Sequence, residues 1–188
     1  MNKELTKTRN LVLTAVLSAI AVVLGWTRWG FIPWFGGVSL TIMHVPVIIA
    51  AIIVGPGAGV IVGFVFGVFS MIQAAIAPTG PTDVWFTNPL LAVLPRLLIS
   101  PCAWLVWKAL KKWPVVGLSV SGAVGSLANT VFVLGMIGLL KYLPWSVLGG
   151  IVVANGLPEM LASAIITLMV VAAYWRIPLG KQKGANLD

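Results

Sequence analysis

Six long apolar segments dominate this sequence and limit what the chain can fold into. Each approaches the roughly 20 residues that a helix needs to cross a bilayer. No polar stretch between them is long enough to form a separate soluble domain. The sequence therefore predicts an all-α integral membrane protein, a single domain over residues 1–188, with six transmembrane helices. These helices are expected at residues 11–26, 40–54, 58–77, 89–107, 115–140 and 147–175.

The composition excludes an ordinary cytosolic enzyme. Only 9% of the residues are charged and 60% are hydrophobic, whereas a soluble domain carries about 25% charged residues. The first apolar segment resembles the core of a signal peptide, but five further segments follow and the region after it is a poor cleavage site. We therefore expect it to be a retained helix.

The net charge of +8 is explained by where the basic residues lie. They cluster before the first segment, between the fourth and fifth segments, and after the last one. The clusters are Lys3, Lys7 and Arg9; Lys108, Lys111 and Lys112; and Arg176, Lys181 and Lys183. Basic residues that flank apolar spans mark cytoplasmic ends. This pattern predicts that both termini are cytoplasmic, that the bilayer is the partner of the apolar surface, and that no nucleic acid is bound.

Small residues recur at helical spacing in two segments. In the third segment Gly55, Gly59, Gly63 and Gly67 are each four residues apart, which allows close approach of another helix. Packing within the helix bundle is the favoured interpretation there. The first segment carries Ala15 and Ala19 at the same spacing, and for these an external partner helix is nearly as good an interpretation.

Two ionisable residues lie deep in predicted spans, where charges are costly and usually functional. Arg96 shares a face of the fourth helix with Asn88, and Glu159 shares a face of the sixth with Asn155, by four-residue spacing. Asn129 adds an amide from the fifth helix. Both charges lie at a similar depth from the external side. They could therefore face one outward cavity and bind a carboxylate, or pair with each other, or do both.

Other candidate residues are weaker. His44 lies near the outer end of the second segment, and a lone histidine there more often makes a local hydrogen bond than binds a metal. Trp85 lies in the external loop of residues 77–87 and could cover a site. No second histidine exists, and Cys102 lies toward the opposite side, so no metal site is expected. No catalytic triad or nucleotide-binding motif is present, so neither catalysis nor a cofactor is predicted.

Five stretches carry a resemblance to a known family. They are TAVLSA in the first helix, HVPVIIAAIIVGPGAGVIVGFVFGVFS across the second and third, NPLLAVLPRLL in the fourth, SLANTVFVLG in the fifth and NGLPEMLASAII in the sixth. In their order and spacing they resemble the substrate-binding S component of energy-coupling factor (ECF) vitamin transporters, over nearly the whole chain.

The resemblance implies a non-enzymatic subunit that captures a micronutrient at the external face of the bacterial cytoplasmic membrane. It implies association with a T-type transmembrane coupling protein and two ATP-binding-cassette ATPases. By position, the implied substrate-binding residues are Asn88, Arg96, Asn129, Asn155 and Glu159, with Trp85 in the covering loop, and we add His44 as a candidate. The implied contacts with the coupling protein are Ala15 and Ala19.

The chemical class of the ligand stays open at this point. Arg96 favours an anionic vitamin such as pantothenate or folate; riboflavin remains an alternative, and thiamin and biotin rank lower. Two other functions are also open. A stand-alone secondary transporter would use Glu159 as its proton carrier, and a membrane enzyme would use Arg96 and Glu159 on a lipid-linked substrate.

Overall fold

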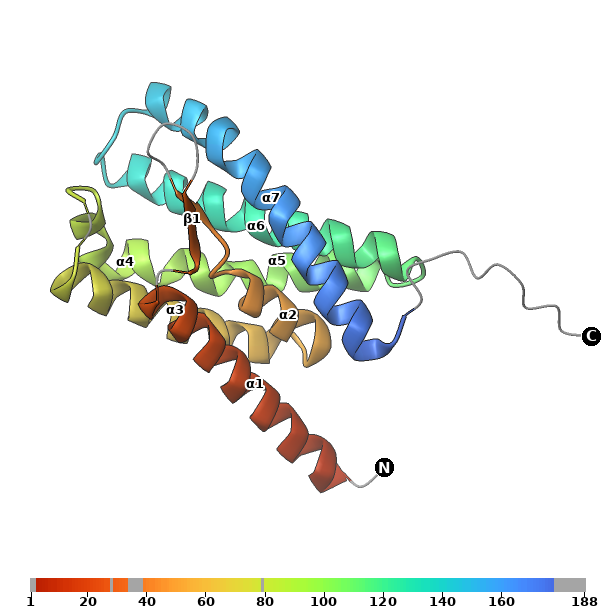
Figure 1. The fold of residues 1–188 in the computed structure, drawn as a ribbon. Helices are drawn as coiled ribbons and strands as arrows, with labels where there is room; N and C mark the ends of the chain where they lie inside the picture. Colours follow the sequence, from red (N-terminus) through yellow and green to blue (C-terminus); the bar gives the residue numbers. More distant parts are fainter. Residues whose placement is uncertain (1–2, 28, 34–38, 79, 178–188) are drawn as a thin grey trace, which may run out of the picture.

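The structure is a computed structural model that describes residues 3–27, 29–33, 39–78 and 80–177. Nearly all of this part of the chain is helical (Figure 1). The helices are α1 (Lys3–Trp26), α2 (Val45–Ile53), α3 (Pro56–Ile76), the 3-10 helix η2 (Asp83–Thr87), α4 (Pro89–Ala92), α5 (Leu94–Leu110), α6 (Pro114–Leu139) and α7 (Trp145–Trp175). Two three-residue strands, β1 (Phe31–Pro33) and β2 (Ser39–Thr41), pair in antiparallel fashion between α1 and α2.

The number of long helices corrects the sequence prediction. Within the described residues five helical stretches, not six, are long and apolar enough to cross a membrane. The predicted second span, residues 40–54, instead contains the end of β2 and the nine-residue helix α2. At 1.5 Å per residue α2 is only about 14 Å long, about half of the apolar thickness of a bilayer.

Burial explains why α2 was mistaken for a span. Eight of its nine residues are buried by the surrounding helices, and a helix that is apolar on all sides is as typical of a protein core as of a membrane. Val47, Ile48 and Ala50 are fully buried in the larger of the two apolar clusters. The run is apolar because protein surrounds it, so the prediction of a membrane span there was wrong.

Gly59, Gly63 and Gly67 pack α3 closely against its neighbours, as the sequence predicted. Gly55 does not, because it precedes the helix and a Cβ there would meet nothing within 4 Å. A Cβ atom on Gly63 would lie 2.5 Å from the carbonyl oxygen of Arg96, and one on Gly67 would lie 2.8 Å from that of Ala92. A Cβ on Gly59 would collide with the side chain of Ser100. Because only glycine allows this approach, α3 holds the beginning of α5, and with it Arg96, at a defined position.

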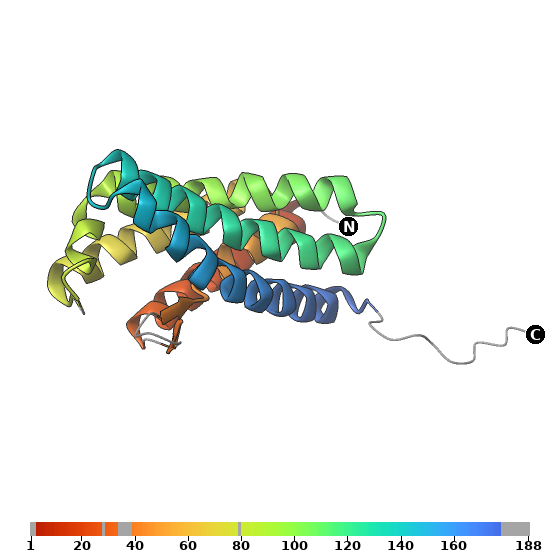
Figure 2. The same ribbon diagram turned by 90° about the horizontal axis from the view of Figure 1, so that it is seen from above.

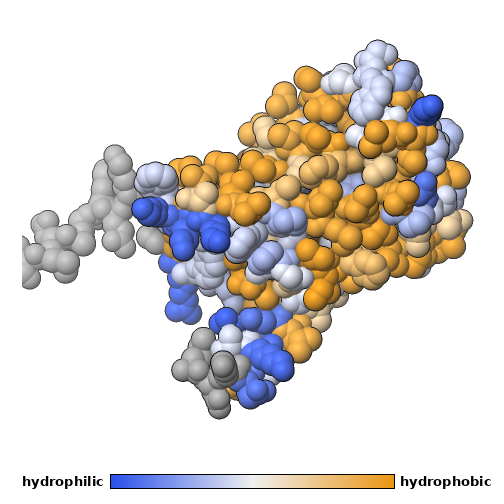
Figure 3. All heavy atoms as spheres, turned by 180° about the vertical axis from the view of Figure 1, so that it is seen from behind, coloured by the Kyte–Doolittle hydropathy of each residue, from blue (hydrophilic) through white to orange (hydrophobic). Residues whose placement is uncertain are grey.

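The two ends of the helix bundle differ in character. The first turn of α1, the turn between α5 and α6, and the last turn of α7 lie toward one end of the molecule in both ribbon views (Figures 1 and 2). Lys7 near the start of α1, Lys108 in the last turn of α5 and Arg176 directly after α7 lie in or next to these segments. Figure 3 shows hydrophobic side chains over a broad flank, with hydrophilic side chains gathered toward the ends. This distribution suits a protein surrounded by lipid.

Candidate functional site

Arg96 lies at the beginning of α5 and is only 6% exposed. Its Nη1 donates a hydrogen bond to the carbonyl oxygen of Leu91 at 2.7 Å. The guanidinium lies near two aromatic rings, at 5.3 Å from the ring centre of Phe66 and 5.0 Å from that of Phe86. Its Nε is buried and has no hydrogen-bond partner. The cation is thus stabilised by ring faces and one neutral carbonyl, and it retains unused donor capacity.

The break between α4 and α5 prepares the place for this arginine. Asn88 accepts a hydrogen bond from the backbone N–H of Leu90 at 3.0 Å, which caps α4. Pro95 has no N–H to donate to the carbonyl of Leu91, the residue one turn earlier. The guanidinium of Arg96 donates to this carbonyl in place of the missing N–H. The side chain of Asn88 is therefore used as the N-cap of α4.

Glu159 lies in the middle of α7 and is also only 6% exposed. Its Oε1 accepts a hydrogen bond from the backbone N–H of Thr41 at 2.7 Å. Its Oε2 accepts one from the hydroxyl of Thr130 on α6 at 3.3 Å. Both carboxylate oxygens therefore have partners, and these partners come from β2 and from α6.

Arg96 and Glu159 do not form an ion pair with each other. Neither side chain has an opposite charge within 4.0 Å among the described residues. The alternative in which the two charges simply hold their helices together is therefore not realised in this structure. Each is instead satisfied by neutral groups, so that a charged ligand group would meet no competing salt bridge.

His44 is completely buried at the N-terminal end of α2, and its Nε2 is hydrogen-bonded to the hydroxyl of Ser163 on α7 at 2.7 Å. Burial, with the charge of Arg96 as a second cause, lowers the pKa of His44 to about 3. The imidazole is therefore neutral at physiological pH. No group of three or more potential metal ligands occurs in the part of the chain that the structure describes.

The remaining candidates are distributed around the same end of α5, α6 and α7. Asn129 on α6 is 7% exposed, and its buried Oδ1 has no hydrogen-bond partner. Asn155 is half-buried on α7, one turn before Glu159. Trp85 in η2 stacks on Tyr142, which follows α6, with ring centres 5.2 Å apart and planes 12° apart. The stack joins the loop after α3 to the loop before α7.

Several contributing residues were not among the candidate site residues. Ser163 shares the polar face of its helix with Glu159 by four-residue spacing, but it was not named as a candidate. Phe66 and Phe86 meet Arg96 only through the tertiary fold, and no local pattern marks them. Thr41 donates to Glu159 from its backbone N–H, which every residue except proline possesses, so this hydrogen bond cannot be predicted from the residue type.

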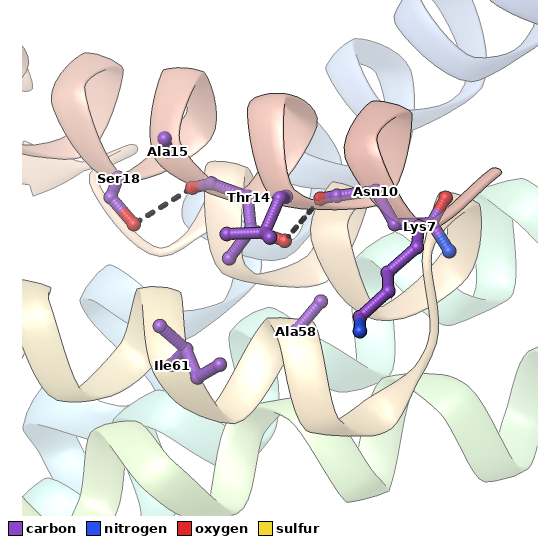
Figure 4. Close-up of a pocket in the computed structure, with 8 residues that line it drawn as sticks. Lys7, Asn10, Thr14, Ala15, Ser18, Ala58 and Ile61 are labelled. Carbon is purple, nitrogen blue, oxygen red and sulfur yellow. Dashed lines mark hydrogen bonds between the residues drawn. The ribbon is translucent and has the colours of Figure 1, made fainter. Parts of the chain in front are cut away.

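The small-residue face of α1 remains outside the bundle. Ala15 and Ala19 are both exposed. Ala15 lines an open groove of about 450 Å³ between α1 and α3, together with Lys7, Thr14 and Ala58 (Figure 4). The hydroxyls along this wall donate within their own helix, for example from Ser18 to the carbonyl of Thr14 at 2.9 Å. This surface is smooth and lacks a packing partner within the described chain.

Comparison with known proteins places the chain in a family. Residues 9–171 match the family model described as "ECF transporter, substrate-specific component". A protein of Lactococcus lactis subsp. cremoris named pantothenic acid transporter PanT is 31% identical over 188 residues, covering 89% of this chain and 94% of that protein. A pantothenate transporter PanT of Leuconostoc mesenteroides subsp. mesenteroides is 31% identical over 137 residues, covering 66% of each chain.

This chain belongs to the family of ECF transporter substrate-specific components. The resemblance noted in the sequence is therefore confirmed, and the protein is a transport protein rather than an enzyme. With its apolar helices it is a multi-pass protein of the bacterial cell membrane.

Proposed function

We propose that this chain captures pantothenate at its external face and delivers it to partner subunits for ATP-driven import. Those partners are a T-type transmembrane coupling protein, which meets the exposed face of Ala15 and Ala19, and two ATP-binding-cassette ATPases. The names of the two relatives support pantothenate as the ligand. Folate and riboflavin are the next candidates.

The observation that carries this proposal is the state of Arg96. It is a buried cation whose partners are two aromatic rings and one neutral carbonyl, and its Nε has no hydrogen-bond partner. A carboxylate suits a guanidinium because two parallel charge-assisted hydrogen bonds can form. Pantothenate carries one carboxylate, and Arg96 is the group we assign to it.

The polar part of pantothenate, its amide and hydroxyl groups, calls for amide and hydroxyl partners. Asn129 and Asn155 face the same region from α6 and α7 in our proposal, and the unpartnered Oδ1 of Asn129 is an acceptor ready for a hydroxyl. The Trp85–Tyr142 stack and the loop capped by Asn88 form the external cover. His44 and Glu159 line the opposite side, next to β2.

The orientation that fits this proposal has both termini in the cytoplasm, with the whole chain acting as one substrate-binding domain. The grouping of basic residues at one end supports it. In this arrangement the β1–β2 hairpin and α2 together replace one membrane span, and they keep the number of chain crossings even.

The direct test is to purify the protein from cells grown in rich medium and identify co-purified small molecules by mass spectrometry. Titration of the emptied protein with pantothenate, folate and riboflavin then ranks the candidates. We expect pantothenate to co-purify and to bind more tightly than the other two. Submicromolar binding of folate or riboflavin, with none of pantothenate, would contradict the proposed ligand while leaving the family assignment intact.

A further inference from the structure

Two aromatic rings from different elements meet at the guanidinium of Arg96. Its Cζ atom lies over the ring of Phe66 on α3, at 5.3 Å from the ring centre, and over the ring of Phe86 in η2, at 5.0 Å. Both distances lie within the roughly 6 Å over which a ring face attracts a cation. Phe66 is 2% exposed and Arg96 is 6% exposed, so salt and water screen this attraction little.

Backbone contacts bring the two rings to this place. A Cβ atom on Gly63 would lie 2.5 Å from the carbonyl oxygen of Arg96, so α3 and α5 approach closely at this point. Phe66 lies three residues after Gly63 and therefore on the same face of α3. Phe86 lies two residues before Asn88, which caps α4. The rings are thus carried by elements whose positions do not depend on the side chain of Arg96.

The guanidinium keeps one edge free of hydrogen bonds within the described chain. Nη1 donates to the carbonyl oxygen of Leu91 at 2.7 Å. Nε is buried and has no hydrogen-bond partner, and Nη2 donates to none of the described residues. The N–H groups of Nε and Nη2 lie side by side and match the two oxygens of a carboxylate. A buried N–H without a partner is costly, so this edge calls for an acceptor from outside the chain.

We propose that Phe66 and Phe86 are positioning residues that make the site selective for a carboxylate, because their rings hold the guanidinium of Arg96 with its Nε edge free for the ligand. This inference rests on the proposed function for the identity of the ligand. A ring stabilises the cation but has no oxygen that would accept from the free edge. An acidic neighbour would occupy those donors, whereas the two rings leave them to the ligand.

Direct contact of Phe86 with the apolar part of the ligand is the competing role, and leucine at this position separates the two. Leucine keeps an apolar side chain but has no ring face to attract a cation. The guanidinium then loses part of its fixed orientation, and ordering it again on binding weakens the affinity for a carboxylate. Tyrosine keeps the ring face and is the conservative variant.

The first measurement is isothermal titration of the full-length protein with pantothenate and with pantothenol, in which an alcohol replaces the carboxylate. In Phe86→Leu we expect the affinity for pantothenate to fall about three- to tenfold and that for pantothenol to change by less than about twofold. Phe86→Tyr should bind both within about twofold of the wild type. Phe64→Leu is the matched control on α3, since Phe64 is 52% exposed, and it should bind both as the wild type does.

A double-mutant cycle makes the same distinction with pantothenate alone, and it decides if pantothenol binds too weakly to be measured. In Arg96→Gln the rings have no cation to hold. Phe86→Leu should therefore change the affinity by less than about twofold in that background. An equal loss in the two backgrounds would show that Phe86 acts without Arg96.

The second measurement is NMR of the Nε–H group of Arg96, assigned by the absence of its resonance in Arg96→Lys. In the substrate-free protein, exchange of this proton with water should be about threefold faster or more in Phe86→Leu, because the guanidinium is held less firmly. Addition of pantothenate to the wild type should move the resonance downfield, since a charge-assisted hydrogen bond forms there. Pantothenol should leave it in place.

Four results overturn the inference. The first is a Phe86→Leu variant that binds pantothenate as tightly as the wild type. The second is an equal loss of affinity for pantothenate and pantothenol, or in both backgrounds of the cycle, which assigns the ring to direct contact. The third is an Nε–H exchange rate that Phe86→Leu leaves unchanged. The fourth is an Nε–H resonance that saturating pantothenate does not move.

Two further cases are covered by the same design. If Phe86→Leu does not fold, Phe66→Leu takes its place under the same criteria. Failure of the wild type to bind pantothenate counts against the proposed ligand instead. The exchange rate of the Nε–H proton in the substrate-free protein then still decides whether the rings hold Arg96.

Discussion

Arg96 donates a hydrogen bond from Nη1 to the carbonyl oxygen of Leu91, the group that Pro95 leaves without a helical donor. Pro95 thus removes a backbone donor from the helix, and the side chain of Arg96, the next residue, replaces that donor. The guanidinium lies 5.3 Å from the ring centre of Phe66 and 5.0 Å from that of Phe86. Arg96 has no ion-pair partner among the described residues, so its charge is available to a ligand.

The first prediction concerns this charge. Arg96→Ala should weaken pantothenate binding by about 10- to 100-fold, because charge-assisted hydrogen bonds to a carboxylate are worth about 1.5–3 kcal/mol. Arg96→Lys should recover part of the loss, since an ammonium retains the charge but not the planar fork. Isothermal titration measures both. An Arg96→Ala protein that folds and binds pantothenate as the wild type does would remove Arg96 from the site.

A second prediction tests the contact between α3 and α5 that positions Arg96. Gly63→Ala should destabilise the protein by about 1–3 kcal/mol, because overpacking a close helix contact forces the backbones apart. The added Cβ would lie 2.5 Å from the carbonyl oxygen of Arg96. Gly57→Ala is the control in the same helix, since a Cβ there meets nothing within 4 Å. Thermal unfolding in detergent should show a lower Tm for the first variant only.

A third prediction concerns the exposed face of α1. Ala15→Trp should block assembly with the coupling protein and spare pantothenate binding, because the large ring fills the groove between α1 and α3 but lies away from Arg96. Ile20→Trp is the control, on an exposed position of α1 outside the groove. Co-purification of the subunits reports assembly. If both variants assemble normally, this face is not the docking surface.

A fourth prediction follows from the neutral state of His44. Its pKa is about 3 in the folded protein and about 6.5 in an unfolded chain. The unfolded state therefore takes up a proton first as the pH falls. The stabilising contribution is complete above pH 6.5 and declines by about 1.4 kcal/mol per pH unit between pH 6.5 and 3. Comparing Tm values at pH 7.5 and 5 should show this loss in the wild type.

His44→Gln removes the titrating group and keeps a side-chain amide near the hydroxyl of Ser163. The part of the pH dependence that belongs to His44 should be absent in this variant. Identical pH dependences of Tm in the two proteins would show that the histidine is not kept neutral by burial.

The spacing of residues in the sequence predicted which side chains of the candidate site share a helix face. Four-residue steps placed Asn155 and Glu159 on one face of the last helix. The glycines of α3 indicated a close helix contact, and the structure has it. These predictions succeeded because helical periodicity acts locally, within about one turn of the chain.

The hydrogen-bond partners of Arg96 and Glu159 could not be predicted from spacing. Arg96 and Glu159 were candidates for pairing, yet Glu159 binds a backbone N–H that is 118 positions away in sequence. The β1–β2 hairpin was missed, and the buried helix α2 was taken for a membrane span. An apolar run has the same pattern in lipid and in a protein core, so only its neighbours distinguish the two.

The sequence by itself determined that this is a helical membrane protein with two deep charges, a basic end and a small-residue face on α1. Hydropathy and helical periodicity are local properties, and they are sufficient for those conclusions. Only the tertiary structure decided that α2 lies inside the protein, that aromatic rings flank Arg96, and that Glu159 reaches the hairpin. Burial and hydrogen bonding between distant segments depend on how the helices pack, which no single stretch of the chain encodes.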